Sequence, residues 1–263
     1  MGIFDMLSSQ KECPNPYTRE DMERDIHPER INKKDLYKDT IKYKRKKGST
    51  RNYFITPLKC AMMYSKDEEI IAELLRNGAD VNWVRGIVNE TVGDLFYIYG
   101  EQNKSLLKIL INAGLDLNAK GRWKDTLLYN LIDTRDIELI QLMLESGVNV
   151  NLGNSHRNTP LSRASATDSS EVVKLLLRYG AEVNTINTMN CTPLYESILG
   201  GQSSVVLAFG NKKPHLDVIK ILINAGADVN AVCNNTSILD LANEVGDDDV
   251  IKALLDVGAY VRI

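Results

Sequence analysis

The chain has 263 residues, with 43% apolar and 25% charged side chains, which is ordinary for a globular protein. Its 32 basic and 35 acidic residues give a formal charge of −3, which excludes a global field that would steer it to nucleic acid or to an anionic membrane. No stretch approaches the roughly 18 consecutive apolar residues of a membrane span, and residues 1–10 lack a signal-peptide core. We therefore expect a cytoplasmic protein.

Residues 1–55 show no clear repeat, although a repeat array follows them. Thr18 and Asp21 have the spacing of a helix start, which predicts a helix over residues 19–26 that ends near Pro28. The end of a repeat array needs a polar outer surface. We therefore interpret residues 1–55 as an N-terminal helical cap, with a degenerate repeat within it as an alternative.

The strongest cluster of charge in the chain lies at residues 42–51. Such a basic run can contact phosphates or act as a nuclear localisation signal, but it is more often a solvated loop. Only Tyr43 and Tyr53 lie nearby in the sequence to stack on bases. The basic residues are Lys42, Lys44, Arg45, Lys46, Lys47 and Arg51.

From residue 56 to residue 263 the chain repeats a string of the form Gly-Ala-Asp-Val-Asn. The successive glycines of this string are 36, 33, 33, 46 and 32 residues apart. A period in this range indicates a repeat architecture before any secondary structure is assigned. The six strings begin at Gly78, Gly114, Gly147, Gly180, Gly226 and Gly258.

A second signature, of the Thr-Pro-Leu type, precedes each glycine by 21 or 22 residues, except in the fifth repeat, where the spacing is 34 residues. An apolar stripe with helical spacing lies between the two signatures, most clearly in residues 172–177. Each unit is therefore predicted to be helix, turn, helix, with Thr capping the first helix and glycine closing the second in a left-handed conformation. The signatures begin at Thr56, Gly93, Thr126, Thr159, Thr192 and Ser237.

These two phased motifs resemble the ankyrin repeat, whose pattern runs Thr-Pro-Leu-His, a short first helix, a longer apolar helix and Gly-Ala-Asp-Val-Asn. The resemblance covers residues 56–263. It implies an all-α solenoid of about six stacked helix-turn-helix units, connected by loops and β-turns. It also implies a protein–protein interaction module rather than an enzyme.

The chain departs from the family pattern in two ways. The second copy is the weakest, because Gly93, Asp94 and Leu95 stand in place of Thr-Pro-Leu. The family's His, which usually ties down the turn between units, is absent from every copy, so we expect less rigid turns. The residues at its position are Lys59, Phe96, Tyr129, Ser162, Tyr195 and Asp240.

The fifth repeat carries an insertion at residues 200–214. Its glycine spacing is 46 residues instead of 33, an excess of 13, which we place between its two helices. Gly, Ser and Pro at both ends indicate a loop around the apolar island at residues 205–209. The island could extend the first helix, pack on the solenoid or dock a partner. Packing is favoured because an exposed apolar run promotes aggregation.

In ankyrin proteins the loops after Gly-Ala-Asp-Val-Asn and the exposed side of the first helices form a concave partner-binding surface. Both tryptophans of the chain fall in such loops, and aromatic and Arg side chains contribute most energy per residue to protein interfaces. The alternative for the tryptophans is packing against the next loop. The predicted partner-binding residues are Trp83, Arg85, Arg122, Trp123, Tyr129, His156, Arg157, Met189 and Tyr195, with Asn187 a further loop residue. The helix positions expected beside them are Cys60, Met63, Tyr97, Asn130, Asp133, Arg163 and Glu196.

No catalytic, cofactor or metal motif stands out in the sequence. It has no phosphate-binding glycine loop, no G-x-S-x-G and no H-E-x-x-H, and its three histidines are scattered. Asp247, Asp248 and Asp249 stand at the start of the last helix, where they complement its dipole rather than bind a metal. We expect neither an enzyme nor a bound cofactor.

The cysteines are the remaining residues with distinctive chemistry. They are far apart in the sequence and lack the spacing of metal ligands. We expect them to be semi-buried thiols in a reducing compartment. They are Cys13, Cys60, Cys191 and Cys233.

The leading functional interpretation is a monomeric module that binds one or more partner proteins. The alternative is nucleic-acid or anionic-surface binding through residues 42–51, with nucleic acid the less favoured partner. The abundance of Asn, Ile and Lys is typical of an AT-rich genome and fits a bacterium or a large DNA virus. In either of those cases the host cytoplasm becomes an alternative location.

Overall fold

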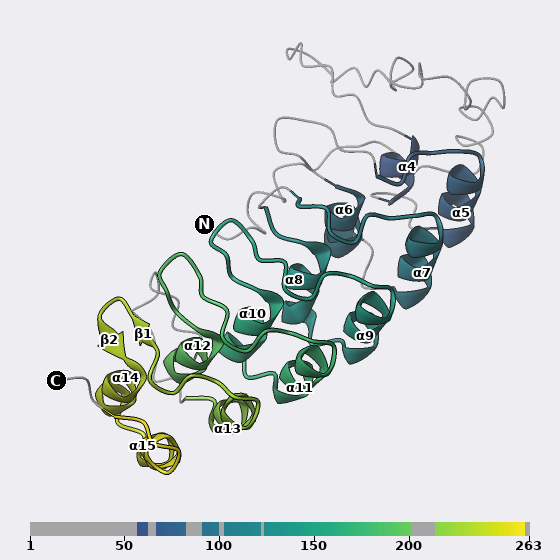
Figure 1. Cartoon of the computed structure of the whole chain (residues 1–263). Helices are drawn as coiled ribbons and strands as arrows, with labels where there is room; N and C mark the ends of the chain where they lie inside the picture. Colours follow the sequence, from purple (N-terminus) through teal and green to yellow (C-terminus); the bar gives the residue numbers. More distant parts are fainter. Residues whose placement is uncertain are drawn as a thin grey trace, which may run out of the picture. The chain divides into compact units, whose positions relative to one another are not determined.

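The fold is an all-α repeat solenoid, and the computed structural model describes residues 57–62, 67–82, 91–99, 103–121, 124–200 and 214–260 of it (Figure 1). The chain divides into two compact units: unit 1 holds residues 1–83 and 98–115, and unit 2 holds residues 84–97 and 116–263. Three predicted features lie outside the described residues. They are the N-terminal cap at residues 1–55, its basic segment at 42–51, and the apolar island at 205–209.

Unit 1 contains three described helices: α4 (Pro57–Cys60), α5 (Glu68–Arg76) and α7 (Lys104–Asn112). Helices α5 and α7 pack together, with Ile71 and Leu107 fully buried. Both helices begin at a side-chain cap, because the carboxylate of Asp67 and the amide oxygen of Asn103 accept hydrogen bonds from the first turn. An asparagine also links their C-terminal turns: Nδ2 of Asn82 donates to the Gly114 oxygen at 2.8 Å.

Unit 2 consists of helix pairs arranged in two rows. The first helix of each pair is α6 (Val92–Tyr99, whose last two residues belong to unit 1), α8 (Leu127–Leu131), α10 (Pro160–Ala166), α12 (Pro193–Leu199) or α14 (Ile238–Val245). The second helices within unit 2 are α9 (Ile137–Glu145), α11 (Ser170–Arg178), α13 (Leu216–Asn224) and α15 (Asp248–Leu255). Figure 1 shows α8, α10, α12 and α14 in one row and α9, α11, α13 and α15 in the other.

The described part of unit 2 also contains three short elements. The 3-10 helix η2 (Ile132–Thr134) continues α8. Strands β1 (Val232–Cys233) and β2 (Thr236–Ser237) form an antiparallel hairpin before α14, with Val232 paired to Ser237 and Cys233 paired to Thr236. No helix among the described residues is long and apolar enough to cross a membrane.

The predicted caps of the first helices are confirmed in α8, α10, α12 and α14. In each, a hydroxyl oxygen accepts a hydrogen bond from the amide three residues later, which satisfies one of the unpaired amides of the first turn. Proline follows the cap in α10 and α12, at a position where no amide donor is needed. The capping residues are Thr126, Thr159, Thr192 and Ser237.

The core lies between the two rows of helices and follows the predicted apolar stripes. On α11, Val172, Val173 and Leu176 are almost fully buried, whereas Glu171 and Lys174 are exposed. Removing a side chain of this size from water contributes about 1.5–3 kcal/mol. Helix α10 packs both on α11, in its own repeat, and on α12, in the next repeat. Because apolar side chains are buried between repeats as well as within them, their burial stabilises the whole stack of repeats rather than a single repeat.

Glycine ends each second helix as predicted. Gly180, for example, follows α11 with φ of +85°, a conformation that other residues adopt only with steric strain. Its amide donates to the Leu177 oxygen at 3.0 Å, and the Ala181 amide donates to the Leu176 oxygen at 3.0 Å. These two bonds satisfy carbonyls that the helix end would otherwise leave unpaired.

The asparagine that ends each of the first five Gly-Ala-Asp-Val-Asn strings links its repeat to the next one. Nδ2 of Asn151 donates to the Gly180 oxygen at 3.2 Å, and its Oδ1 accepts from the Glu182 amide at 2.9 Å. We call this arrangement the asparagine clamp. Within unit 2 the clamp recurs at Asn184, which bonds Gly226 and Asp228, and in part at Asn118, which bonds Asn149, and at Asn230, which bonds Tyr260.

The second repeat begins two residues earlier than we predicted. Helix α6 starts at Val92, and Thr91 rather than Gly93 caps it. The Thr91 hydroxyl accepts from the Asp94 amide at 3.1 Å, while the Asp94 carboxylate accepts from the Thr91 amide at 2.8 Å, and both residues are buried. Asp94 therefore stands where the family pattern has His. Phe96, which we had assigned to that position, is fully buried in the core.

The fifth repeat has its extra residues where the sequence places them. Helix α12 ends at Leu199, and Gly200 has the left-handed conformation of a helix end, with φ of +59°. The second helix of this repeat, α13, begins at Leu216. The extra residues therefore lie between the two helices of one repeat. Helices α12 and α13 still pack against each other.

Candidate partner-binding face

Unit 2 has a face built from first helices and from the loops that join successive repeats. We call residues 152–158, 185–191 and 231–236 the finger loops. They extend from the row of first helices on the side away from the second helices (Figure 1). The finger loops and the solvent-facing side chains of α8, α10, α12 and α14, with Tyr97 of α6, make up what we call the inner face.

An ion pair crosses two repeats at the middle of the inner face. Nε of Arg163, on α10, lies 2.7 Å from Oδ1 of Asp133, and its terminal nitrogen lies 2.9 Å from Oδ2 of the same carboxylate. This two-point contact raises the pKa of Arg163 and fixes the plane of its guanidinium. Asp133 belongs to η2, so the pair joins the third repeat to the fourth.

Two tyrosines lie in the electrostatic field of this ion pair. Burial raises the pKa of Tyr129 to about 12, and it raises the pKa of Tyr97 as well. In each case the positive charge of Arg163 opposes the shift, whereas Asp133 adds to it. Both phenols therefore remain protonated at neutral pH, and their hydroxyls can donate hydrogen bonds to a partner.

The carboxylate of Glu196 continues this face on α12. Burial raises its pKa, and a hydrogen bond from Asn187 together with the charge of Arg163 offsets only part of that shift. The bond runs from Nδ2 of Asn187 to Oε1 of Glu196 at 3.2 Å. Asn187 is itself buried, and its Oδ1 accepts from the amides of Met189 and Cys191 at 2.9 and 3.0 Å. Asn187, which we expected only as a further residue of this loop, therefore shapes its finger loop from inside.

Tyr195 lies beside Glu196 and connects to the next finger loop. Burial raises the pKa of Tyr195, and the negative charges of Glu244 and Glu196 raise it further. The side chain of Thr236, in strand β2 of the sixth repeat, acts on the phenol of Tyr195 and lowers this pKa. The fifth and sixth repeats thus share this part of the inner face.

The finger loops bring exposed side chains of different kinds together. His156 and Arg157 are exposed, and the His156 oxygen accepts from the Thr188 amide at 2.9 Å, which joins two neighbouring fingers near their tips. Met189 and Ile186 are 41% and 40% exposed, an unusual degree for large apolar side chains. Basic and apolar groups therefore stand side by side on adjacent loops.

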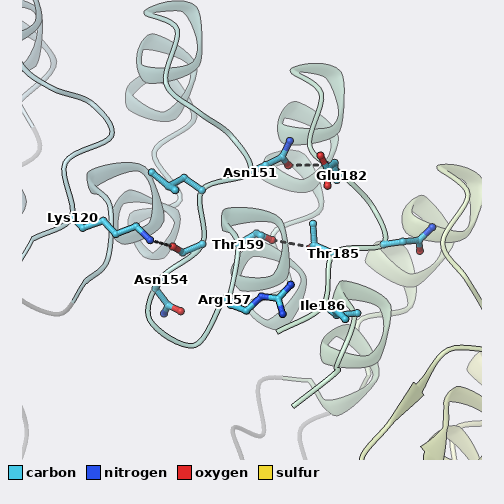
Figure 2. Close-up of a pocket in the computed structure, with 11 residues that line it drawn as sticks. Lys120, Asn151, Asn154, Arg157, Thr159, Glu182, Thr185 and Ile186 are labelled. Carbon is cyan, nitrogen blue, oxygen red and sulfur yellow. Dashed lines mark hydrogen bonds between the residues drawn. The ribbon is translucent and has the colours of Figure 1, made fainter. Parts of the chain in front are cut away.

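A pocket of about 490 Å³ opens between the stems of these two fingers. Figure 2 shows that Lys120 closes one side, where its Nζ donates to the Gly153 oxygen at 2.7 Å. Thr159 and Thr185 meet across the pocket with their hydroxyl oxygens 3.3 Å apart. Arg157 also lines it. The walls consist mainly of amide, hydroxyl and charged groups, which can hydrogen-bond a polar side chain.

Sequence reasoning missed Asp125, which lies half-buried at the base of a finger. Its Oδ1 is buried without a hydrogen-bond partner. Burial raises the pKa of Asp125, while Asn154, Arg163 and His156 oppose the shift. No motif marks this residue, because its burial arises only when the neighbouring repeat stacks beside it.

The expectation that the cysteines are unpaired is wrong for two of them. A disulfide joins Cys191 to Cys233, 42 residues apart in the sequence, and their Cα atoms are 4.6 Å apart. Cys191 comes directly before the cap of α12, and Cys233 lies in strand β1. The stacking of adjacent finger loops, which no spacing rule within one repeat reveals, brings the two residues together.

The inner face collects those predicted partner-binding residues that the structure describes. Tyr129 and Tyr195 lie on first helices, and His156, Arg157 and Met189 lie on finger loops. The flanking positions Tyr97, Asp133, Arg163 and Glu196 join them there. The predicted residues Trp83, Arg85, Arg122 and Trp123, and the basic segment from Lys42 to Arg51, lie outside the described residues.

The described part of the chain holds no group of three or more His, Cys, Asp or Glu side chains that could bind a metal ion. Asp247, at the start of α15, acts as a helix cap as predicted: Oδ1 accepts from the Asp249 and Val250 amides, each at 3.1 Å.

Comparison with known protein families gives two matches. A model described as "Ankyrin repeats (3 copies)" matches residues 95–187, and one described as "Ankyrin repeat" matches residues 189–234. Together these segments cover more than half of the chain and include the finger loop at 152–158 and, apart from residue 188, the one at 185–191. No curated protein matches the chain.

Proposed function

Because the chain belongs to the ankyrin-repeat family, we propose that it binds a partner protein through its inner face. Ankyrin repeats generally mediate protein–protein interaction, and proteins built from them are typically non-enzymatic. The observation that carries the proposal is the position of Met189 and Ile186, which leave large apolar surface in water on one finger loop beside His156 and Arg157 at the tip of the neighbouring loop. Burial of such a mixed surface against a partner lowers the free energy of the complex relative to the separate proteins.

The first helices support the same surface. Tyr129 and Tyr195 are held at the inner face by partial burial, so they lose little conformational freedom when a partner binds. The ion pair between Arg163 and Asp133 holds the guanidinium in one orientation before any partner arrives. A prearranged set of aromatic and Arg side chains is characteristic of energetic centres in protein interfaces.

The outer side of the second helices differs in chemistry. Lys174 on α11 and Lys220 on α13 are exposed among other charged residues, and such surfaces contribute little to association. Substitutions on the outer side of unit 2 can therefore serve as controls for substitutions on the inner face. The partner is a protein with a surface long enough to reach more than one finger loop.

The test is site-specific photo-crosslinking followed by an affinity measurement. A photoreactive residue is placed at Met189 or, as control, at Lys174, and the full chain is irradiated in extract of its source cells. We expect one protein to crosslink from Met189 and not from Lys174. With that protein purified, an Arg157→Ala, Met189→Ala, Tyr195→Ala variant should bind at least about tenfold more weakly.

The control variant for this affinity measurement is Lys174→Ala, Lys220→Ala. It removes two exposed side chains from the outer side and should bind like the unmodified chain. Equal weakening by both variants, or crosslinking from Lys174 alone, would contradict the proposal. A Trp83→Ala, Trp123→Ala variant extends the test to the predicted tryptophans, whose replacement should also weaken binding.

A further inference from the structure

The disulfide between Cys191 and Cys233 lies between the fingers of the fifth and sixth repeats. Both residues are almost fully buried, at 4% and 2% exposed, and both sulfurs lie 3.7 Å from the main-chain oxygen of Met189. The bond therefore crosses from the base of one finger to the strand of the next. Each of the two cysteines is connected to a different residue of the inner face.

The connection on the Cys191 side runs through Asn187. The Cys191 amide donates to Oδ1 of Asn187 at 3.0 Å, and the Cys191 oxygen accepts from the Asn187 amide at 3.1 Å. Asn187 in turn donates to Glu196 at 3.2 Å. A movement of Cys191 would therefore reach Glu196 through two short contacts.

The connection on the Cys233 side runs through the β-hairpin. Cys233 pairs with Thr236 across the two strands, and the Thr236 side chain acts on the phenol of Tyr195, whose pKa it lowers. The hairpin has two ladder positions, and its turn residues Asn234 and Asn235 are exposed with positive φ. Hairpins of this size are marginally stable on their own, so the covalent bond to Cys191 adds to the contact with α14 that also holds this one in place.

We propose that Cys191 and Cys233 form a reversible thiol–disulfide switch, which fixes the finger of the sixth repeat beside Tyr195 and Glu196 when oxidised and releases it when reduced. The reductant is a small thiol and the oxidant is the corresponding small disulfide, such as glutathione and its disulfide. In reduction, one thiolate attacks a sulfur of the pair and forms a mixed disulfide. This first step releases one cysteine as a thiolate. A second small thiolate attacks the small-molecule sulfur of the mixed disulfide, which releases the other cysteine and forms the small disulfide. The two protons of the small thiols leave both cysteines as thiols.

The burial of both sulfurs sets how the switch operates. A small thiol reaches them only when a fingertip opens, and Thr188, Met189 and Asn190 above Cys191 are all exposed. Local opening of such loops requires far less free energy than global unfolding. The pair therefore exchanges with small thiols in the folded protein, while larger redox proteins have restricted access.

The first test measures the redox state of each cysteine in the full chain. The protein is equilibrated with glutathione buffers of different composition, alkylated, digested and analysed by mass spectrometry. We expect Cys191 and Cys233 to change together from two free thiols to one disulfide, reversibly, while the chain stays folded. Cys60→Ser should leave this transition unchanged, and Cys233→Ser should abolish it. Failure of Cys191 to pair with Cys233 in oxidising buffer, or pairing that requires unfolding, would overturn the proposal.

The second test asks whether the bond controls the finger. Hydrogen exchange of residues 187–191 and 232–237 is compared between the oxidised and the reduced chain, and we expect it to be about tenfold faster after reduction. Exchange in α9, remote from the bond, should not change. A disulfide that forms without altering exchange in these segments would show a passive link and would refute a switch. Neither test uses a partner, so both can fail without affecting the proposed function; an effect of redox state on affinity would rest on that function.

Discussion

Arg163 contacts the carboxylate of Asp133 through two of its nitrogens, at 2.7 and 2.9 Å, and so joins α10 to the end of the preceding first helix. The two side chains are 40% and 36% exposed, so water screens the pair and limits its energy. We expect a double-mutant cycle with Arg163→Ala and Asp133→Ala, measured by urea unfolding, to give a coupling of about 0.5 kcal/mol.

The coupling should fall further in high salt, because screening acts on exposed charges. A coupling several times larger would mean that the pair is a main source of stability, contrary to our interpretation that it orients Arg163 for a partner.

The asparagine clamp contributes to stability between repeats. Asn151→Ala removes the bonds to the Gly180 oxygen and to the Glu182 amide, and water can replace both because these groups lie at the surface. We expect a loss of about 1 kcal/mol in the free energy of unfolding, measured by urea denaturation. Asn243→Ala, at an exposed position of α14, is the control and should lower stability much less.

Gly121 is required by the buried cap of α6. A Cβ at this position would collide with the carboxylate of Asp94, which would then have to leave the Thr91 amide. We expect Gly121→Ala to lower the free energy of unfolding by about 2 kcal/mol, measured by chemical denaturation. In an Asp94→Ala background the same substitution should cost much less. Equal costs in the two backgrounds would show that the collision is relieved in some other way.

Stability should depend on pH through Glu196. Burial raises its pKa above the ordinary value of 4.5, so folding favours the protonated form. The stabilisation from this group is therefore complete below pH 4.5 and is lost as the pH rises through the folded pKa. The unmodified chain should lose stability relative to Glu196→Gln between about pH 4 and about pH 7, measured by urea unfolding.

Glu171→Gln, on the exposed side of α11, controls for the loss of one negative charge. If instead the unmodified chain gains stability relative to Glu196→Gln as the pH rises, the effects of Asn187 and Arg163 on the pKa of Glu196 outweigh the effect of burial.

The repeat pattern made much of unit 2 predictable from the sequence. Thr159 and Gly180 bound one repeat because capping and the left-handed turn are local properties of the chain, and α10 and α11 lie between them as expected. The second repeat was misplaced by two residues for an equally local reason. Asp94 completes a capping box with Thr91, and this local signal places the cap two residues before Gly93.

The inner face was predictable only in outline. His156, Arg157 and Met189 could be placed on finger loops because the loops have fixed positions in each repeat. The burial of Asp125 and the disulfide between Cys191 and Cys233 could not, since both depend on how one finger lies against the next. The helices and turns of a single repeat can therefore be predicted from the sequence. The contacts between loops of neighbouring repeats become visible only in the three-dimensional structure.

The asparagine clamp has a consequence for how such a chain can change over evolutionary time. The Asn151 side chain bonds only to the main-chain oxygen of Gly180 and the main-chain amide of Glu182, so it accepts any neighbour whose backbone follows the same path. Whole repeats can then be duplicated, lost or exchanged without a matching change in the unit before them. The side chains of the inner face are free to diversify under this arrangement, because the joints between repeats do not depend on their identity.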